Sequence, residues 1–262
     1  MKKTNLIVLI TIAAVLPFFI FKGRVSTVAD LKIAESQQQL LEYLRVRDDV
    51  QAGRLAQEIL AIEPDNLTAL WAKAELLRRV YDLENSRAQL VDILKKYPTH
   101  APSLISLAYI YYYNRDFNQA FALLKKVIND RQAQGQNLAM AYMLIGSINA
   151  KKSSAGGIFS KFTYGTRVKG YFEKAKKISP DLPEVYLGLG TFYLLAPAIA
   201  GGNPDKAIEN LKYAVKLAPQ FATANARLAQ AYQRKGDAGK YNYYFERAKE
   251  LDPGNEVLRE IE

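Results

Sequence analysis

Residues 101–130 read APSLISLAYIYYYNRDFNQAFALLKKVIND, and this stretch decides the fold class. It places large, small and aromatic residues where two packed helices need them. In chain order these positions hold Leu107, Ala108, Tyr111, Ala120, Leu124 and Val127. Small residues let the two helices approach each other, and large ones fill the space between neighbouring helix pairs. The stretch therefore predicts a two-helix unit.

Prolines mark the ends of such units along the chain. Pro64 and Pro98 lie 34 residues apart, and Pro219 and Pro253 lie 34 residues apart again. Each proline follows an apolar helix end and cannot continue that helix. The positions of residues 101–130 recur further on, as Leu228, Ala229, Tyr232, Tyr241, Phe245 and Ala248. A repeat architecture is therefore the first hypothesis.

This period and these positions resemble the tetratricopeptide-repeat (TPR) family, over residues 33–255 as six units. The resemblance implies an all-α fold: a TPR solenoid of antiparallel helix pairs in a right-handed superhelix, with an N-terminal hydrophobic helix. The expected domains are a signal anchor at residues 1–25, a linker at 26–34, and a solenoid of about six helix pairs at 35–262. The motif itself says little about function.

Two inserts separate the helices of the fourth and fifth units, and each contains a glycine pair, Gly156-Gly157 and Gly201-Gly202. Loops between the two helices of a unit emerge on one edge of a solenoid, so we expect the inserts to form a single lip. The stretch FYLLAPAIAGGNPDKAIENLKYA is similar to bacterial envelope TPR proteins. It is more weakly similar to the periplasmic TPR component of tripartite solute transporters, which is typically a lipoprotein. This chain has no cysteine to carry the lipid.

The leader places an apolar run at residues 6–21 between two clusters of basic residues. Its sixteen residues would span about 24 Å as a helix, against roughly 30 Å of hydrocarbon. We favour an uncleaved signal anchor; a cleaved signal peptide and a buried helix are the alternatives. The expected localisation is a bacterial inner membrane, single-pass, with the repeat body on the periplasmic side.

Composition argues against several kinds of chemistry. The sequence has no cysteine and one histidine, His100, so it offers no thiolate ligands and no histidine pair for a metal or nucleophile site. No pair of carboxylates stands out from the rest. The net charge of +10 fits a solvated helical surface or a mild preference for anionic partners. We therefore expect no enzyme, no cofactor and no metal.

The TPR resemblance implies a concave groove, lined by set positions of the first helix in each unit. Nearly all of these positions are apolar or aromatic here: Trp71, Ile105, Tyr109, Tyr112, Tyr113, Met140, Met143, Leu187, Thr191, Leu194 and Leu195. Basic rims are expected from Arg78, Arg79, Arg227 and Arg234. Such a surface suits an apolar partner. The alternative is that other segments of the chain cover it.

The insert of the fourth unit mixes apolar and basic residues. We expect a contact through Ile158, Phe159, Lys161, Phe162 and Tyr164. This pattern is typical of an interfacial contact with anionic lipid. The alternative is that Phe159 and Phe162 pack back onto the solenoid.

These features together predict a membrane-anchored TPR scaffold or adaptor that binds a protein or peptide through an apolar-aromatic groove. No nucleic-acid partner is expected. The alternative is a binding component for a small hydrophobic solute, which needs a closed pocket lined by Tyr109, Tyr113, Met143 and Leu195. A closed volume would distinguish the two functions.

Overall fold

The structure is a computed structural model that describes residues 28–130, 132–157, 163 and 165–261. These residues are mostly helical and contain no strand, which confirms the predicted all-α class. None of the helices among them is long and apolar enough to span a membrane. The expected anchor at residues 1–25 lies outside the described residues and stays a prediction.

Twelve of the described helices form consecutive pairs, in which the two helices contact each other. The pairs are α1 (Val28–Val46) with α2 (Asp49–Ile62), α3 (Leu67–Arg79) with α4 (Leu83–Lys96), α5 (Ala101–Tyr113) with α6 (Phe117–Asn129), α7 (Gly135–Ala155) with α9 (Thr166–Ile178), α10 (Pro183–Leu195) with α11 (Pro204–Leu217), and α12 (Ala222–Lys235) with α13 (Ala238–Leu251). A short helix, α14 (Glu256–Ile261), packs against α12 and α13. The fold is a solenoid of helix pairs, as predicted.

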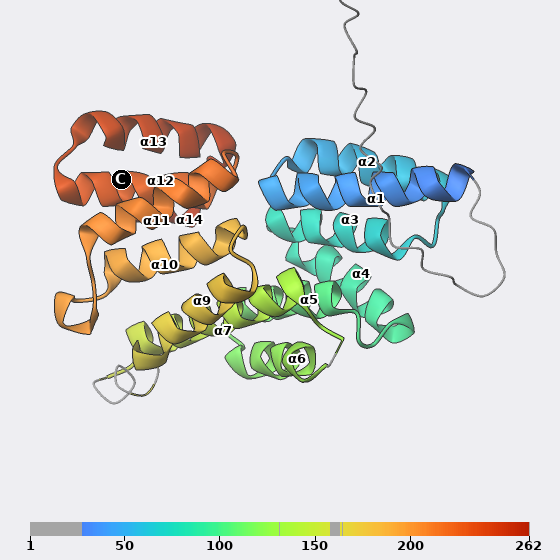
Figure 1. Ribbon diagram of the computed structural model, residues 1–262, viewed down its shortest axis with the longest axis horizontal. Coiled ribbons are helices and arrows are strands. Elements are labelled where there is room, and N and C mark those ends of the chain that lie inside the picture. Colours follow the sequence, from blue (N-terminus) through green and yellow to red (C-terminus); the bar gives the residue numbers. More distant parts are fainter. Residues whose placement is uncertain (1–27, 131, 158–162, 164, 262) are drawn as a thin grey trace, which may run out of the picture.

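The solenoid curves strongly. The first helices of successive pairs contact one another in the order α1, α3, α5, α7, α10, α12 and α14. In Figure 1 the chain follows an arc, so that the first units (blue) and the last units (red) face each other. The inside of this arc is where the predicted groove would lie.

The turn between the two helices of a unit is built in the same way in the first three units. Asp48, Asp82 and Asp116 lie 34 residues apart, and each side chain accepts a backbone N–H in the first turn of the helix that follows. This is the usual N-cap interaction. The second helix of each of these units therefore begins at a position that the sequence repeats.

The residue before each of these aspartates has a left-handed backbone. The φ angles are 65° for Arg47, 63° for Tyr81 and 60° for Arg115, whereas the last unit uses Gly236 at 77°. This conformation is costly for a residue with a Cβ atom. The turns at Arg47 and Tyr81 thus hold a large side chain where a glycine would relieve strain.

The fourth and fifth units pack closely around one aromatic ring. Phe172 of α9 is buried, and it lies against Gly146 of α7 and Gly188 of α10. A Cβ atom at Gly146 would come within 2.7 Å of the ring, and one at Gly188 within 2.9 Å. These glycines allow α7, α9 and α10 to share a single core, because no smaller residue exists.

Candidate functional site

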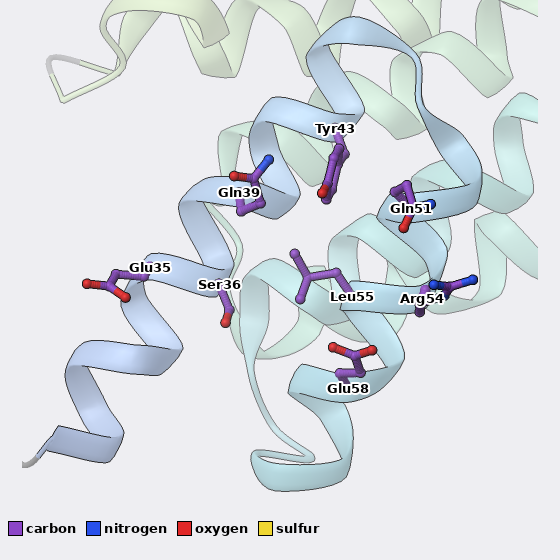
Figure 2. A pocket seen from close by; sticks show the side chains of 8 residues that line it. All are labelled: Glu35, Ser36, Gln39, Tyr43, Gln51, Arg54, Leu55 and Glu58. Atoms are coloured by element: carbon purple, nitrogen blue, oxygen red, sulfur yellow. The ribbon is translucent and has the colours of Figure 1, made fainter.

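A polar hollow lies on the surface between α1 and α2, at the beginning of the solenoid (Figure 2). It has a volume of about 360 Å³ and is lined by Glu35, Ser36, Gln39, Tyr43, Gln51, Arg54, Leu55 and Glu58. No unit precedes α1 within the described residues, so this face has no helix pair stacked on it. Polar side chains suit such an exposed end. The hollow is therefore best explained as a solvated cap.

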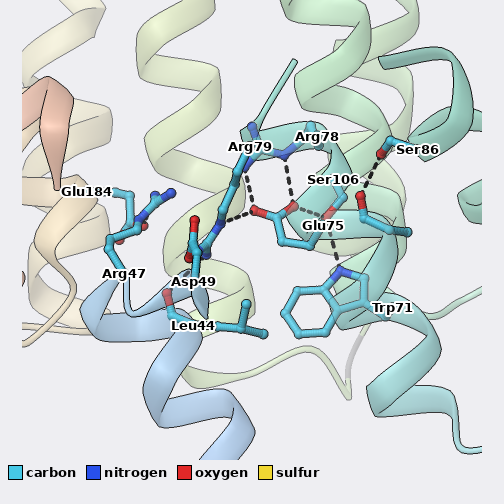
Figure 3. A network of polar contacts seen from close by, with 11 residues as sticks. Leu44, Arg47, Asp49, Trp71, Glu75, Arg78, Arg79, Ser86, Ser106 and Glu184 are labelled. Atoms are coloured by element: carbon cyan, nitrogen blue, oxygen red, sulfur yellow. Dashed lines mark hydrogen bonds and ion pairs between the residues drawn. The ribbon is translucent and has the colours of Figure 1, made fainter. Parts of the chain in front are cut away.

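The inside of the arc carries a buried charge network around Glu75 of α3 (Figure 3). The Glu75 carboxylate accepts hydrogen bonds from both Nε (2.8 Å) and Nη2 of Arg78. It also accepts from Arg79 Nε at 3.0 Å and from Ser106 Oγ at 2.7 Å. Four donors thus satisfy one buried carboxylate, as a buried charge requires.

This Glu75 network reaches the neighbouring units on both sides. Ser106 Oγ of α5 accepts a hydrogen bond from Trp71 Nε1 at 3.0 Å. On the other side, Arg79 Nη1 lies 2.5 Å from Asp49 Oδ1, and Arg79 Nη2 donates to the Leu44 carbonyl at 3.0 Å. The network therefore joins the first three units through their inner surfaces.

Glu75 and Arg78 stay charged at neutral pH. Burial by itself raises the pKa of Glu75. The charges of Arg78 and Arg79 and the hydrogen bonds from Arg78 and Ser106 outweigh this effect, so the pKa of Glu75 lies well below the usual range. Burial lowers the pKa of Arg78, and the Glu75 charge raises it well above its ordinary value. The two hydrogen bonds between Arg78 and Glu75 are charge-assisted, so they fix the relative position of the two side chains.

A second charged contact joins the two ends of the arc; we call it the end-to-end contact. Arg47 Nη2, in the turn after α1, lies 2.5 Å from Glu184 Oε1 of α10. The Arg47 guanidinium also lies over the Phe221 ring, 4.2 Å from its centroid. Next to them, Arg45 Nη1 donates to the Asp181 carbonyl at 3.4 Å. The first unit therefore touches the fifth unit and the residue before α12.

The end-to-end contact is less completely paired than the Glu75 network. Arg47 Nε and Glu184 Oε2 are buried, and neither has a hydrogen-bond partner among the described residues. A buried donor or acceptor without a partner costs stability. The two ends of the arc are thus held together by a contact that is itself imperfect.

Four tyrosines of α5 and of the turn after α3 form a wall beside these charges. We call Tyr81, Tyr109, Tyr112 and Tyr113 the tyrosine wall. The ring centroids of Tyr81 and Tyr113 are 5.8 Å apart, and those of Tyr112 and Tyr113 are 5.9 Å apart. The Arg78 guanidinium lies 4.5 Å from the Tyr109 ring centroid. The Glu75 network and the wall are therefore in direct contact.

The acidic residues Asp252 and Glu256, at the C-terminal side of α13 and the start of α14, affect the pKa values of the tyrosine wall. The pKa of Tyr81 is raised to about 12 by burial, by Tyr113, and by the negative charges of Asp252 and Glu256. Burial also raises the pKa of Tyr112, and Glu256 adds to this effect. These phenols are neutral at physiological pH and can both donate and accept hydrogen bonds.

Comparison with known proteins identifies the architecture. No family model matches the chain. The small glutamine-rich tetratricopeptide repeat-containing protein 2 of Mycosarcoma maydis is 28% identical over 108 residues, which are 41% of this chain and 29% of that protein. The chloroplastic tetratricopeptide repeat domain-containing protein PYG7 of Arabidopsis thaliana is 35% identical over 79 residues, 30% of this chain and 25% of that protein. The chain is similar to tetratricopeptide-repeat proteins over these stretches, and its helix pairs have the tetratricopeptide-repeat fold.

Solved structures support the TPR fold. The human IFIT1 dimer with PPP-AAAA superposes with a TM-score of 0.57 and 14% sequence identity, covering 87% of this chain and 52% of that one. At this level of identity the likeness concerns the fold alone. The curated relatives match over about a third of their length or less, so their activities and partners are not carried over.

The structure divides the predicted groove residues into three groups. Ile105, Met143 and Leu194 are each 5% exposed and belong to the hydrophobic core. The partly exposed residues are Trp71, Tyr109, Tyr112, Tyr113, Met140, Leu187 and Thr191. Leu195 is 46% exposed. Neighbouring helices of the arc therefore cover Ile105, Met143 and Leu194, and a binding role for the groove residues stays a prediction.

Most arginines of the predicted basic rims form ion pairs within the chain. Arg78 and Arg79 are bound to Glu75 inside the arc, and Arg227 Nη1 lies 2.6 Å from Glu260 Oε2 with only 9% of its side chain exposed. Arg234 is exposed, and its Nη1 donates to the Leu194 carbonyl at 2.5 Å. Three of the four arginines are thus neutralised by carboxylates of the chain itself.

The acidic residues that pair with these arginines and with Arg47 were not predicted from the sequence. Glu75 lies three and four residues before Arg78 and Arg79, which is the spacing of helical ion pairs and could have been noticed. Glu184 gave no such signal, because Arg47 lies 137 residues away. The predicted insert contact, Ile158, Phe159, Lys161, Phe162 and Tyr164, lies outside the described residues and stays a prediction.

Proposed function

We propose that this TPR protein is a protein-interaction scaffold that binds a peptide or extended protein segment on the tyrosine wall. One observation carries the proposal. In the described part of the chain, no hydrogen bond involves the hydroxyl group of Tyr81, Tyr109, Tyr112 or Tyr113, although other hydroxyls such as that of Tyr186 are bonded. Tyrosines with unused hydroxyls and partly exposed rings are typical of surfaces that bind other proteins.

A peptide suits this wall better than a small apolar solute does. A peptide backbone offers N–H and C=O groups to the tyrosine hydroxyls, and its side chains can pack on the rings. The solute alternative required Tyr109, Tyr113, Met143 and Leu195 to line one closed pocket. Met143 is buried in the core and Leu195 is largely exposed, so the observations favour the peptide.

The end-to-end contact suggests how a partner could gain access. It holds the first and fifth units together through Arg47 and Glu184, and it leaves one polar atom of each side chain unpaired. Opening it would let water satisfy both atoms, which lowers the cost of separation. We propose that the arc opens at this contact when a partner enters.

Anchoring is a second part of the proposal. Residues 6–21 form an apolar run with basic residues on both sides, which supports a single span of a bacterial inner membrane with the repeat body in the periplasm. After extraction with alkaline carbonate, the chain is expected to stay in the membrane fraction. An intact mass that corresponds to a mature N-terminus near Asp30 would contradict the anchor.

The binding proposal is tested with a library of random peptides displayed on phage and selected against the full-length chain. The dissociation constants of the enriched peptides are then measured for wild type, for Tyr113→Ala, and for Tyr243→Ala. Tyr243 is 66% exposed on α13, far from the wall in sequence and fold, and serves as the matched control.

Loss of an aromatic anchor typically costs ~2 kcal/mol, so Tyr113→Ala should weaken binding more than tenfold while Tyr243→Ala leaves it unchanged. Circular dichroism checks that both variants keep their helices. Peptides that bind Tyr113→Ala as tightly as wild type would show that the wall is not the binding surface.

A further inference from the structure

The loop between α10 and α11 exposes an apolar tip. Ile199 is 100% exposed, the largest value among the exposed large apolar residues that the structure describes, and Leu195 at the start of the loop is 46% exposed. Pro197, Ala198 and Ala200 are exposed as well. A cluster of apolar side chains in water usually marks a contact site.

The backbone of this loop is built to hold the tip in place. The N–H groups of Ala200 and Gly202 both donate to the Pro197 carbonyl, at 2.9 and 3.0 Å. Gly201 has a φ of 95°, and a Cβ atom at Gly202 would lie 1.9 Å from the Ala196 carbonyl oxygen. Only glycines allow this turn, so the exposed tip follows from a defined conformation.

Three basic side chains lie near the end of α10, from which the loop starts. The Nζ atoms of Lys169 (α9) and Lys206 (α11) each lie 5.7 Å from the centroid of the Tyr193 ring. Arg234 of α12 donates to the Leu194 carbonyl, one residue further along. Helices from three different units thus bring positive charge to one place.

These three charges are not neutralised by the described part of the chain. None of them forms an ion pair with a carboxylate there, and the nearby Asp205 is paired with Lys235 at 2.8 Å. Both lysines and Arg234 are exposed. The loop therefore presents an exposed apolar tip, and three basic side chains without a carboxylate partner in the described residues lie near its start.

We propose that the loop at residues 196–203 binds the surface of a bilayer that contains anionic lipids. Ile199 would enter the boundary between headgroups and acyl chains, and Lys169, Lys206 and Arg234 would meet the anionic headgroups. The phosphates of a nucleic acid could pair with the three basic side chains, but a nucleic acid has no apolar region that would bury Ile199. A folded protein would need a preformed pocket for a protruding tip, whereas a bilayer takes it without one.

This surface is separate from the tyrosine wall, so its test is independent of the proposed function. The chain has no cysteine, so Ile199→Cys can be labelled at a single site in the full-length protein with an environment-sensitive dye. The same dye on Val50→Cys, a residue 74% exposed on α2, serves as the control. Each protein is mixed with phosphatidylcholine vesicles with or without phosphatidylserine.

The dye at residue 199 should shift to the blue and be quenched by acyl-chain quenchers in phosphatidylserine vesicles, while the dye at residue 50 should not. Lys169→Gln, Lys206→Gln and Arg234→Gln should each weaken this binding about fivefold, since one basic residue near an anionic surface contributes ~1 kcal/mol. The matched substitutions Lys95→Gln and Lys249→Gln, at exposed lysines elsewhere, should have little effect.

Two results would overturn the proposal. One is the absence of a blue shift at residue 199, or an equal shift in vesicles without phosphatidylserine. The other is an equal shift produced by heparin or an oligonucleotide without vesicles, which would assign the loop to a soluble polyanion. Circular dichroism of the labelled proteins ensures that neither result comes from unfolding.

Discussion

The Glu75 network and the end-to-end contact are both buried charge clusters on the inside of the arc, but they differ in how fully their atoms are paired. Glu75 accepts four hydrogen bonds, from two arginines and a serine. The Arg47–Glu184 pair leaves Arg47 Nε and Glu184 Oε2 without partners. The first cluster joins neighbouring units, and the second joins units far apart in sequence. The difference suggests that the Glu75 network stabilises the packing of neighbouring units, whereas the end-to-end contact only joins the first unit to the fifth.

The largest effect is expected from Glu75→Ala. This substitution leaves Arg78 and Arg79 buried without their carboxylate, so it should lower the free energy of unfolding by ~3–5 kcal/mol. The control is Glu42→Ala, which breaks an exposed pair with Arg45 and should cost at most ~1 kcal/mol. Urea unfolding followed by circular dichroism measures both. Equal effects would mean that the network contributes no more than a surface pair.

The second prediction concerns replacement of a whole pair. Glu184→Met alone should be destabilising, because Arg47 loses its partner, whereas Arg47→Met with Glu184→Met should stay within about 1 kcal/mol of wild type. The matched double variant Glu75→Met with Arg78→Met should remain strongly destabilised, because Arg79 and Ser106 lose their acceptor. If both double variants were neutral, the proposed difference between the clusters would be wrong.

A third group, the partly buried His100, has no charged partner among the described residues. Burial lowers the pKa of His100 to about 4, and its Nδ1 lies 2.8 Å from Ser103 Oγ. The unfolded chain binds this proton near pH 6.5 and the folded chain only near pH 4, so stability is lost as pH falls between these values. The loss at pH 5 should be at most ~2 kcal/mol.

Urea unfolding at pH 7 and pH 5 tests this, with His100→Gln as the comparison, because carboxylates also respond to acid. The wild type should lose more stability than the variant between the two pH values. An identical loss in both proteins would show that His100 titrates normally in the fold.

The smallest effect is expected at the left-handed turns. Arg115 has a φ of 60°, and it is exposed, so Arg115→Gly should relieve strain and raise the free energy of unfolding by ~0.5–1 kcal/mol. Arg47 has the same conformation but carries the end-to-end contact, so Arg47→Gly should lower stability. If both urea midpoints rose, the strain at Arg47 would cost more stability than the end-to-end contact supplies.

Much of the fold could be predicted because its determinants are local and periodic. Pro64, Pro98, Pro219 and Pro253 end helices by their own covalent geometry, and the small and large residues around Ala120 and Leu124 report which face of a helix is packed. The aspartate caps at residues 48, 82 and 116 repeat with the same period. Helix ends, packed faces and N-caps are therefore determined by residues within a single repeat unit.

The candidate site was only half predicted. Tyr109, Tyr112 and Tyr113 were placed correctly on the inner helix α5, since their position within the unit fixes it. The contacts of their neighbours were not predicted, because the sequence left open whether other segments of the chain cover the groove. Ile105 and Met143 lie in the core, since neighbouring helices of the arc cover these positions. Arg78 binds Glu75 within α3.

The sequence by itself determined the helices, their pairing and the repeat, because each depends on residues within about 34 positions of one another. Only the tertiary structure decided how far the solenoid curves, and with it which charges meet. Arg47 reaches Glu184 because the small angles between successive units add up along the chain. No single unit encodes that sum, so a contact across 137 residues appears only when all the units are in place.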